Sequence, residues 1–513
     1  MTMLKNNFKN LIVLDLANNH FGDLNHAKKV VSGFSKIINK YSINCTIKFQ
    51  FRDLDNFIHK DYKNSDLKYI KRFRETKLDE NEFKKLFSFI KSKKIKTSCT
   101  PFDEVSIKII EDLKFDYLKI ASVSALDFSI HERAIKNKIP KLISTGGLTI
   151  DEIDKIVSFY SKKKQKFAIM HCVAIYPSKN TDLNLSVIEN LIKRYPGIPI
   201  GWSTHENPNE LNPSILAYAK GARIFEKHIG INSKKYKLND YSITPELFEK
   251  WYCNLSSGIE ILGKNKKIVN NKEKITLSNL QRGVYAQTNI DKYNTIKKKN
   301  VYFAIPLQKG QLSAIEFKNK LISLKNFIKD KPLIKKYIKQ DEHTKSEELI
   351  FSYLHELKGM LNQQSINIGS TFDLEISHHK GIKNFKKVGA FLFNIINKEY
   401  AKKLIVMLPN QEHPSHHHKK KVESFLIVFG KLYIKNNTKR FNLNPGDTYH
   451  VNKNTWHQFK AGNQGCIFEE ISTRSIKSDS YYRSKKLKAL ERTDRKTFIN
   501  NWFSVKNILN KKV

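Results

Sequence analysis

The chain has 513 residues, and because one hydrophobic core rarely grows beyond about 250–300 residues, we expect two to four domains. Its formal net charge of +43 suggests nucleic-acid binding, but only 12 of the 92 basic residues are Arg. Nucleic-acid sites favour Arg and interleaved aromatic residues, so the excess Lys is interpreted as solvated surface without a nucleic-acid partner. Five scattered cysteines indicate a reduced, cytoplasmic protein, and the apolar run at residues 11–17 is too short to span a membrane.

The first half of the chain alternates short β-rich runs with segments of helical periodicity. Eight such runs occur: LIVLDLA from Leu11, TIKFQF from Thr46, IKTSCT from Ile95, YLKIAS from Tyr117, KLIST from Lys141, KFAIMHC from Lys166, IPIGWST from Ile198 and RIFEKHI from Arg223. An open doubly wound sheet would carry a glycine-rich phosphate loop after its first strand, and this sequence has none. The pattern therefore predicts an α/β fold, a (β/α)₈ TIM barrel over residues 1–265.

The second half is expected to hold two further domains. A Lys/Asn-rich linker (263–274) precedes a small module of short strands at 275–335, and a charged helical connector follows it. Residues 345–475 are rich in β-runs and histidine, and residues 476–513 form a basic tail.

Polar residues gather where the barrel strands end, which is where barrel active sites lie. Lys48 and Lys119 each stand between apolar neighbours within a strand, and two lysines at one mouth describe a site for phosphate and carboxylate, unless one of them merely pairs with Asp15. His205 and His228 end the seventh and eighth strands, so they are candidates to share one divalent metal.

The strand-end motifs resemble those of the N-acetylneuraminate (sialic acid) synthase family. The matching runs, in order, are LDLANNHFG, IKFQ, CTPFD, LKIAS, STGG, HCVAIYP, GWSTH and FEKHIG. QRGVYA, from Gln281, is similar to the antifreeze-like (SAF) module that follows the barrel in that family.

This resemblance implies metal-dependent condensation of phosphoenolpyruvate with an N-acetylated or related aldose, giving a nonulosonic acid and phosphate. The metal, Mn²⁺ or Mg²⁺, would be held by His205 and His228, with Asp15 as the third catalytic residue. The residues that the resemblance assigns to substrates are Asn19, Lys48, Gln50, Thr100, Lys119, Ser122, Ser144, Ser203, Asp240 and Arg282. It also implies a homodimer with domain exchange, in which Arg282 of one subunit reaches the sugar in the other.

The chain departs from the family pattern at three positions. Asp15 stands where the family has Glu, while Ser124 and Ala174 replace a Glu and an Asn of its sugar pocket. We therefore expect an acceptor other than N-acetylmannosamine. A non-catalytic sugar-binding or regulatory protein on a decayed barrel is the alternative, although the retained lysines and histidines argue against it.

The C-terminal histidines fit the first motif of the cupin barrels. His416, His418, Glu423 and Gly430 follow the spacing HxHx4Ex6G, and His457 lies after a Pro-Gly-Asp turn. In a small β-barrel these three histidines and Glu423 are predicted to bind Zn²⁺, Mn²⁺ or Fe²⁺. The text HPSHHHKKKVESF resembles the D-lyxose isomerase-like group, which leaves open whether the domain isomerises a sugar or only binds one.

Overall fold

The computed structural model describes residues 8–318, 321–340, 342–437, 439–476 and 478–502. They fall into two compact units, and the boundary between them in the sequence lies between residues 267 and 268. No helix in these ranges is both long and apolar enough to cross a membrane.

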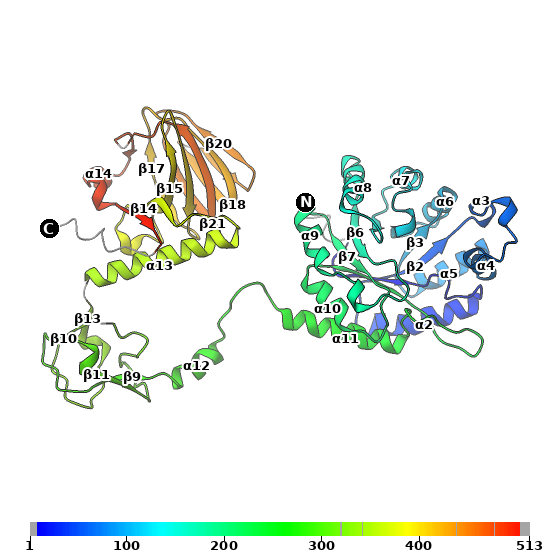
Figure 1. Ribbon diagram of the computed structural model, residues 1–513, viewed down its shortest axis with the longest axis horizontal. Coiled ribbons are helices and arrows are strands. Elements are labelled where there is room, and N and C mark those ends of the chain that lie inside the picture. Colours follow the sequence, from blue (N-terminus) through cyan, green and yellow to red (C-terminus); the bar gives the residue numbers. More distant parts are fainter. Residues whose placement is uncertain (1–7, 319–320, 341, 438, 477, 503–513) are drawn as a thin grey trace. The chain divides into compact units, whose positions relative to one another are not determined.

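The first unit is a closed barrel of eight parallel strands in sequence order, as predicted (Figure 1). Its strands are β1 (Leu11–Asp15), β2 (Cys45–Phe51), β3 (Lys96–Pro101), β4 (Tyr117–Ile120), β5 (Lys141–Ser144), β6 (Phe167–Cys172), β7 (Ile200–Ser203) and β8 (Ile224–His228). β1 closes the barrel by pairing with both β2 and β8. In that register Asp15 lies opposite Lys48 on one side and His228 on the other.

Helices follow the strands and cover the outside of the barrel (Figure 1). They are α2 (Leu24–Lys40), α3 (Leu54–Phe57), α4 (Lys68–Glu75), α5 (Glu80–Ser92), α6 (Glu104–Asp112), α7 (Phe128–Ala134), α8 (Ile150–Lys162), α9 (Ser186–Arg194), α10 (Asn212–Ala219) and α11 (Pro245–Leu262). Local sequence explains where several begin: Thr149 and Glu152, for example, form a reciprocal capping box at the start of α8. The large apolar core lies between these helices and the outward faces of the strands.

Side chains inside the barrel change character along its axis. A second apolar cluster includes Leu11, Val13, Leu142, Met170 and Ile224 near the amino ends of the strands. Because successive residues of a strand point to opposite faces, the inward positions nearer the carboxyl ends are two or four residues further along. Those positions carry charged and polar side chains, so the strand alternation places the polar layer at the mouth.

The second unit begins with a small β-module that has its own apolar core. Its elements are α12 (Asn271–Asn279), β9 (Gly283–Ala286), β10 (Thr295–Ile296), β11 (Val301–Ala304), β12 (Leu321–Ser323) and β13 (Ile338–Gln340). β9 pairs with β11, while β10, β12 and β13 form a three-stranded sheet. The predicted likeness of this module to the antifreeze-like domain stays a prediction.

The rest of the second unit is a β-domain with helix α13 (Glu342–Gln363) packed against it. Its strands are β14 (Thr371–Ser377), β15 (Ala390–Asn397), β16 (Tyr400–Met407), β17 (Glu412–His417), β18 (Glu423–Asn436), β19 (Lys439–Leu443), β20 (Thr448–Val451), β21 (His457–Thr473), β22 (Tyr481–Tyr482) and β23 (Lys496–Asn501), and a short helix α14 (Lys485–Lys488) lies between the last two. β22 pairs with β17 and β23 pairs with β14. Residues 481–482 and 496–501, within the stretch predicted to be a basic tail, thus belong to the sheet, and Thr497 and Ile499 of β23 are buried.

Candidate active site

Four buried charges occupy the mouth of the barrel. Lys48 Nζ lies 2.5 Å from Glu226 Oε1, and Lys119 Nζ lies 2.7 Å from Glu226 Oε2. Lys48 Nζ also lies 2.9 Å from Asp15 Oδ2. β8 thus supplies one carboxylate that both lysines share, and β1 supplies a second for Lys48.

Pairing opposes the effect of burial on the pKa of Glu226 and of Lys48, whereas at Lys119 burial is the larger effect and lowers the pKa. Burial alone would raise the pKa of Glu226, but Lys119 and Lys48 hold that pKa well below its ordinary value. Burial alone would lower the pKa of Lys48, and Asp15 and Glu226 instead raise it above its ordinary value. At neutral pH the mouth therefore presents fixed charges that need no reorganisation to meet an anion.

His205 and His228 lie side by side at the same mouth, with ring centroids 5.2 Å apart. His205 Nδ1 is 2.9 Å from the Val173 carbonyl oxygen, which orients the ring and leaves Nε2 for a metal. His228 Nδ1 faces Asp15 Oδ2 at 3.5 Å. Burial lowers the pKa of His205 to about 3 and also lowers that of His228. Neutral imidazole is the form that binds a metal ion, so this pair fits the predicted ligand role.

Several other predicted residues surround these charges. Gln50 Nε2 donates to Asp15 Oδ2 at 3.2 Å, and Asn19 Nδ2 donates to the Ile229 carbonyl oxygen at 2.8 Å. The hydroxyls of Thr100 and Ser144 are buried and have no hydrogen-bond partner in the described part of the chain. Unsatisfied buried hydroxyls are uncommon, and such groups at a mouth are available to a ligand.

Ser122 and Ser203 also lie at the strand ends. Ser122 Oγ accepts a hydrogen bond from the Gly146 amide at 2.9 Å, and Ser203 is buried at the end of β7. Asp240 is exposed in the loop after β8. Arg282 is exposed in the second unit, where its guanidinium stacks on Phe303, so its contact with a sugar stays a prediction.

Glu226, which lies in the run RIFEKHI, is not among the site residues predicted from the sequence. The signal for it is the alternation in β8, where Ile224, Glu226 and His228 share one face. Because Glu226 lies on the same strand face as the candidate metal ligand His228, its carboxylate is predicted to point into the barrel. Its sharing by two lysines depends on barrel closure, which no local pattern reveals.

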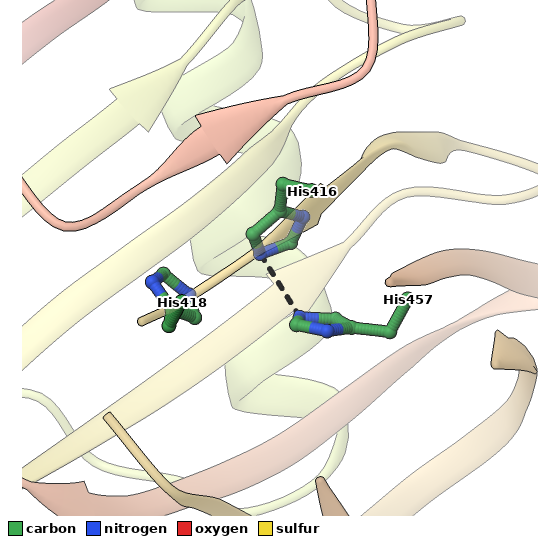
Figure 2. A group of neighbouring side chains, drawn as sticks. All are labelled: His416, His418 and His457. Carbon is green, nitrogen blue, oxygen red and sulfur yellow. Dashed lines mark hydrogen bonds between the residues drawn. The ribbon is translucent and has the colours of Figure 1, made fainter. Parts of the chain in front are cut away.

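In the C-terminal domain, the three predicted histidines form a buried group, here called the histidine cluster: His416, His418 and His457. Figure 2 shows His416 of β17 and His457 of β21 turned toward one another, with their Nε2 atoms 3.1 Å apart, and His418, which directly follows β17, beside them. Glu423 Oε2 lies 3.2 Å from His457 Nε2, and Glu423 Oε1 lies 3.4 Å from His418 Nε2. Three imidazoles and one carboxylate converging in this way are a donor set suited to a divalent metal.

The histidine cluster opens into a cavity of about 530 Å³ inside the domain. In the cavity wall, Lys421 contacts Glu423 and its Nζ lies 3.0 Å from Glu470 Oε1. Across the cavity, Lys496 Nζ pairs with Glu375 Oε1 at 2.5 Å. The sequence does not predict the pairing of Lys421 with Glu470 or of Lys496 with Glu375, because these partners lie far apart in the chain.

The barrel mouth holds a candidate anion site beside a candidate metal pair, and comparison with known proteins identifies the family. The NeuB family model matches residues 40–267, and the Cupin domain model matches residues 403–468. A solved structure of spore coat polysaccharide biosynthesis protein E from Chromobacterium violaceum is 35% identical, covering 64% of this chain and 99% of that one at a TM-score of 0.60. This chain belongs to the NeuB family, and it carries a cupin domain near its C-terminus.

Two relatives with named activities are synthases. N,N'-diacetyllegionaminic acid synthase of Campylobacter jejuni is 25% identical over 338 residues, which cover 63% of this chain and 98% of that protein. N-acetylneuraminate-9-phosphate synthase of Mus musculus is 27% identical over 243 residues, 46% of this chain and 66% of that protein. The chain thus spans just under two thirds of the mouse protein and nearly all of the bacterial one.

Proposed function

We propose that the barrel condenses phosphoenolpyruvate with an aldose to give a nonulosonic acid and inorganic phosphate. The observation that carries this proposal is the pair of buried lysines, Lys48 and Lys119, which both pair with Glu226 beside His205 and His228. Family membership and the named synthases support the same reaction class.

The lysines and nearby hydroxyls would bind the phosphate and carboxylate of phosphoenolpyruvate. Carbon 3 of phosphoenolpyruvate attacks the aldehyde carbon, water adds at carbon 2, and the tetrahedral intermediate expels phosphate. Asp15 would orient that water or accept its proton, since Gln50 already holds its Oδ2. A divalent metal bound by His205 and His228 would supply Lewis-acid polarisation of the aldehyde.

The charges at the mouth distinguish this proposal from a decayed, non-catalytic barrel. Ionised groups are costly to bury, and here two lysines and two carboxylates are retained with full pairing. A non-catalytic barrel would not need these buried charges, and apolar residues could occupy the same positions.

Phosphate release from phosphoenolpyruvate, measured with a panel of aldoses, tests the activity. We expect release with at least one aldose and a higher kcat/KM for some sugar other than N-acetylmannosamine. The reason is that Ser124 and Ala174 leave polar groups of that sugar unpaired, at a cost of about 1–3 kcal/mol each. Absence of release across the panel with metal present would contradict the synthase, and N-acetylmannosamine as the best acceptor would contradict the specificity.

For the cupin domain we propose metal-dependent sugar binding or isomerisation. The supporting observation is that the histidine cluster faces a cavity of about 530 Å³, within the usual range for a small-molecule site. Its wall mixes ion pairs with hydroxyl and aromatic side chains, including Ser377, Tyr482 and Phe459. Such a lining suits a polyhydroxylated ligand.

Changing His416, His418 and His457 together to Ala in the full chain should remove one bound metal ion per chain. Metal content is measured by mass spectrometry in a background that also lacks His205 and His228, so that only the cupin site is counted. His417→Ala is the matched control, because that ring packs on Trp456 and Tyr481 and is not part of the histidine cluster. Unchanged metal content in the triple variant, or aldose–ketose interconversion that survives it, would contradict the proposal.

A further inference from the structure

Beside the lysine pair, the barrel mouth carries a second cationic feature centred on Arg52, which follows β2. The Arg52 guanidinium lies between two aromatic rings, 4.1 Å from the centroid of Phe73 on α4 and 3.7 Å from that of Phe102 after β3. The two rings restrict the position of the guanidinium, and the N–H groups on its edge are the part that forms hydrogen bonds.

That edge is only partly satisfied. Arg52 Nη2 donates to Gln50 Oε1 at 3.0 Å, while Nε has no hydrogen-bond partner within the described ranges. Nor does Arg52 form an ion pair with any described carboxylate; burial is the main reason that its pKa falls to about 10. Asp15 and Asp103 attract this cation from beyond ion-pair distance and raise its pKa, but burial outweighs them, so a bound anion would relieve the remaining cost of desolvation.

Arg52 lines a hollow of about 50 Å³ at the mouth, together with Gln50, Asn18, His20 and Lys77 among others. None of the residues that line it, all within the described part of the chain, carries a carboxylate. His20 Nδ1 accepts a hydrogen bond from the Gly22 amide, and burial lowers the pKa of His20 to about 4. Its ring is therefore neutral with the proton on Nε2, which makes it a further donor rather than a competing charge.

The size of the hollow decides what it holds. Whole sugars occupy sites of several hundred cubic ångströms, whereas about 50 Å³ takes a single small group. Neither Lys48 nor Lys119 lines the hollow, so it is separate from the anion site assigned to phosphoenolpyruvate. It remains close to the chemistry, because Arg52 bonds to Gln50 and Gln50 bonds to Asp15.

We infer that Arg52 determines acceptor specificity by binding a negatively charged substituent of the aldose, a phosphate or a carboxylate. This inference rests on the proposed synthase activity, since the acceptor is the second substrate of that reaction. Arg52 selects for the substituent through charge-assisted hydrogen bonds from its edge, and Lys77 adds a second positive charge.

Kinetics with three matched acceptors test the inference: N-acetylmannosamine, its 6-phosphate and the corresponding 6-carboxylate. In the wild type, kcat/KM should be about tenfold to a hundredfold higher for one charged sugar than for the neutral one. The better of the two charged sugars identifies the group. Arg52→Gln should remove this preference, and Arg52→Lys should keep part of it.

Arg74→Gln is the matched control. Arg74 lies on the same helix as Phe73, and its side chain donates to the Lys63 carbonyl oxygen. The preference for the charged sugar should survive its replacement. If Arg52→Gln lowers kcat/KM by the same factor for neutral and charged acceptors, Arg52 acts only through Gln50, and the inference is overturned.

A binding measurement keeps this inference distinct from the synthase proposal. With phosphoenolpyruvate saturating its own site, mannose 6-phosphate should raise the melting temperature of the wild type more than mannose does. In Arg52→Gln, the two sugars should raise the melting temperature by the same amount. Equal shifts in the wild type would overturn the role of Arg52 whether or not turnover occurs. Absence of phosphate release with every aldose would instead overturn the synthase.

Discussion

Replacing His228 or His205 with Ala is expected to lower condensation by about a thousandfold or more while the barrel stays folded. The metal that these residues would hold supplies several kcal/mol of stabilisation to the developing alkoxide, and each 1.36 kcal/mol is about tenfold in rate. Removing one imidazole leaves too few protein ligands to retain the ion. Phosphate release at saturating phosphoenolpyruvate, together with metal content, measures the effect.

Chelation of the wild type should reproduce the loss, and added Mn²⁺ should restore the wild type but not the variants. His131→Ala is the control for a buried histidine, since His131 lies on α7 with both ring nitrogens bonded, to Tyr160 and to the Ala125 carbonyl. It should lower the melting temperature and leave the metal requirement unchanged. Full activity in a metal-free wild-type sample would show that the pair has no metal role.

Glu226→Gln should destabilise the barrel by about 3–5 kcal/mol, because it leaves Lys48 and Lys119 buried without their shared counter-ion. The side chain keeps its size, so the loss reports charge rather than packing. Calorimetric unfolding of the full chain measures it. We also expect phosphoenolpyruvate to raise the melting temperature of this variant more than that of the wild type, since the ligand then supplies the missing negative charge.

The destabilisation caused by Glu226→Gln should become smaller at acidic pH. The folded-state pKa of Glu226 lies below its ordinary value of 4.5, so its stabilising contribution is complete above that pH and is lost as the pH falls further. The difference in stability between wild type and variant should therefore narrow on acidification below about pH 4.5.

Glu206→Gln provides the matched comparison. Glu206 Oε1 pairs with Lys227 Nζ at 2.6 Å, and both side chains are as deeply buried as the mouth residues. It should also destabilise the protein, but without an enhanced response to phosphoenolpyruvate. Identical responses of the two variants would mean that Lys48 and Lys119 do not bind that substrate.

The sequence was sufficient for the barrel and for most of its mouth. Strand alternation and helical periodicity are local properties, so eight strands could be counted and their last inward residues identified, including Lys48, His205 and His228. The histidine cluster was equally accessible, because the spacing of His416, His418 and Glu423 places them at the end of one strand and the start of the next.

Only the tertiary structure decided which of these groups meet. Lys48, Lys119 and Glu226 come from the second, fourth and eighth strands, and barrel closure brings their charges within hydrogen-bonding distance. Arg52 contacts two rings from different segments, and β23 is held in the sheet by pairing with β14. Local periodicity records which face a residue occupies, but partners far apart in the chain are selected by the packing of the whole fold, and the charges of this site depend on that packing.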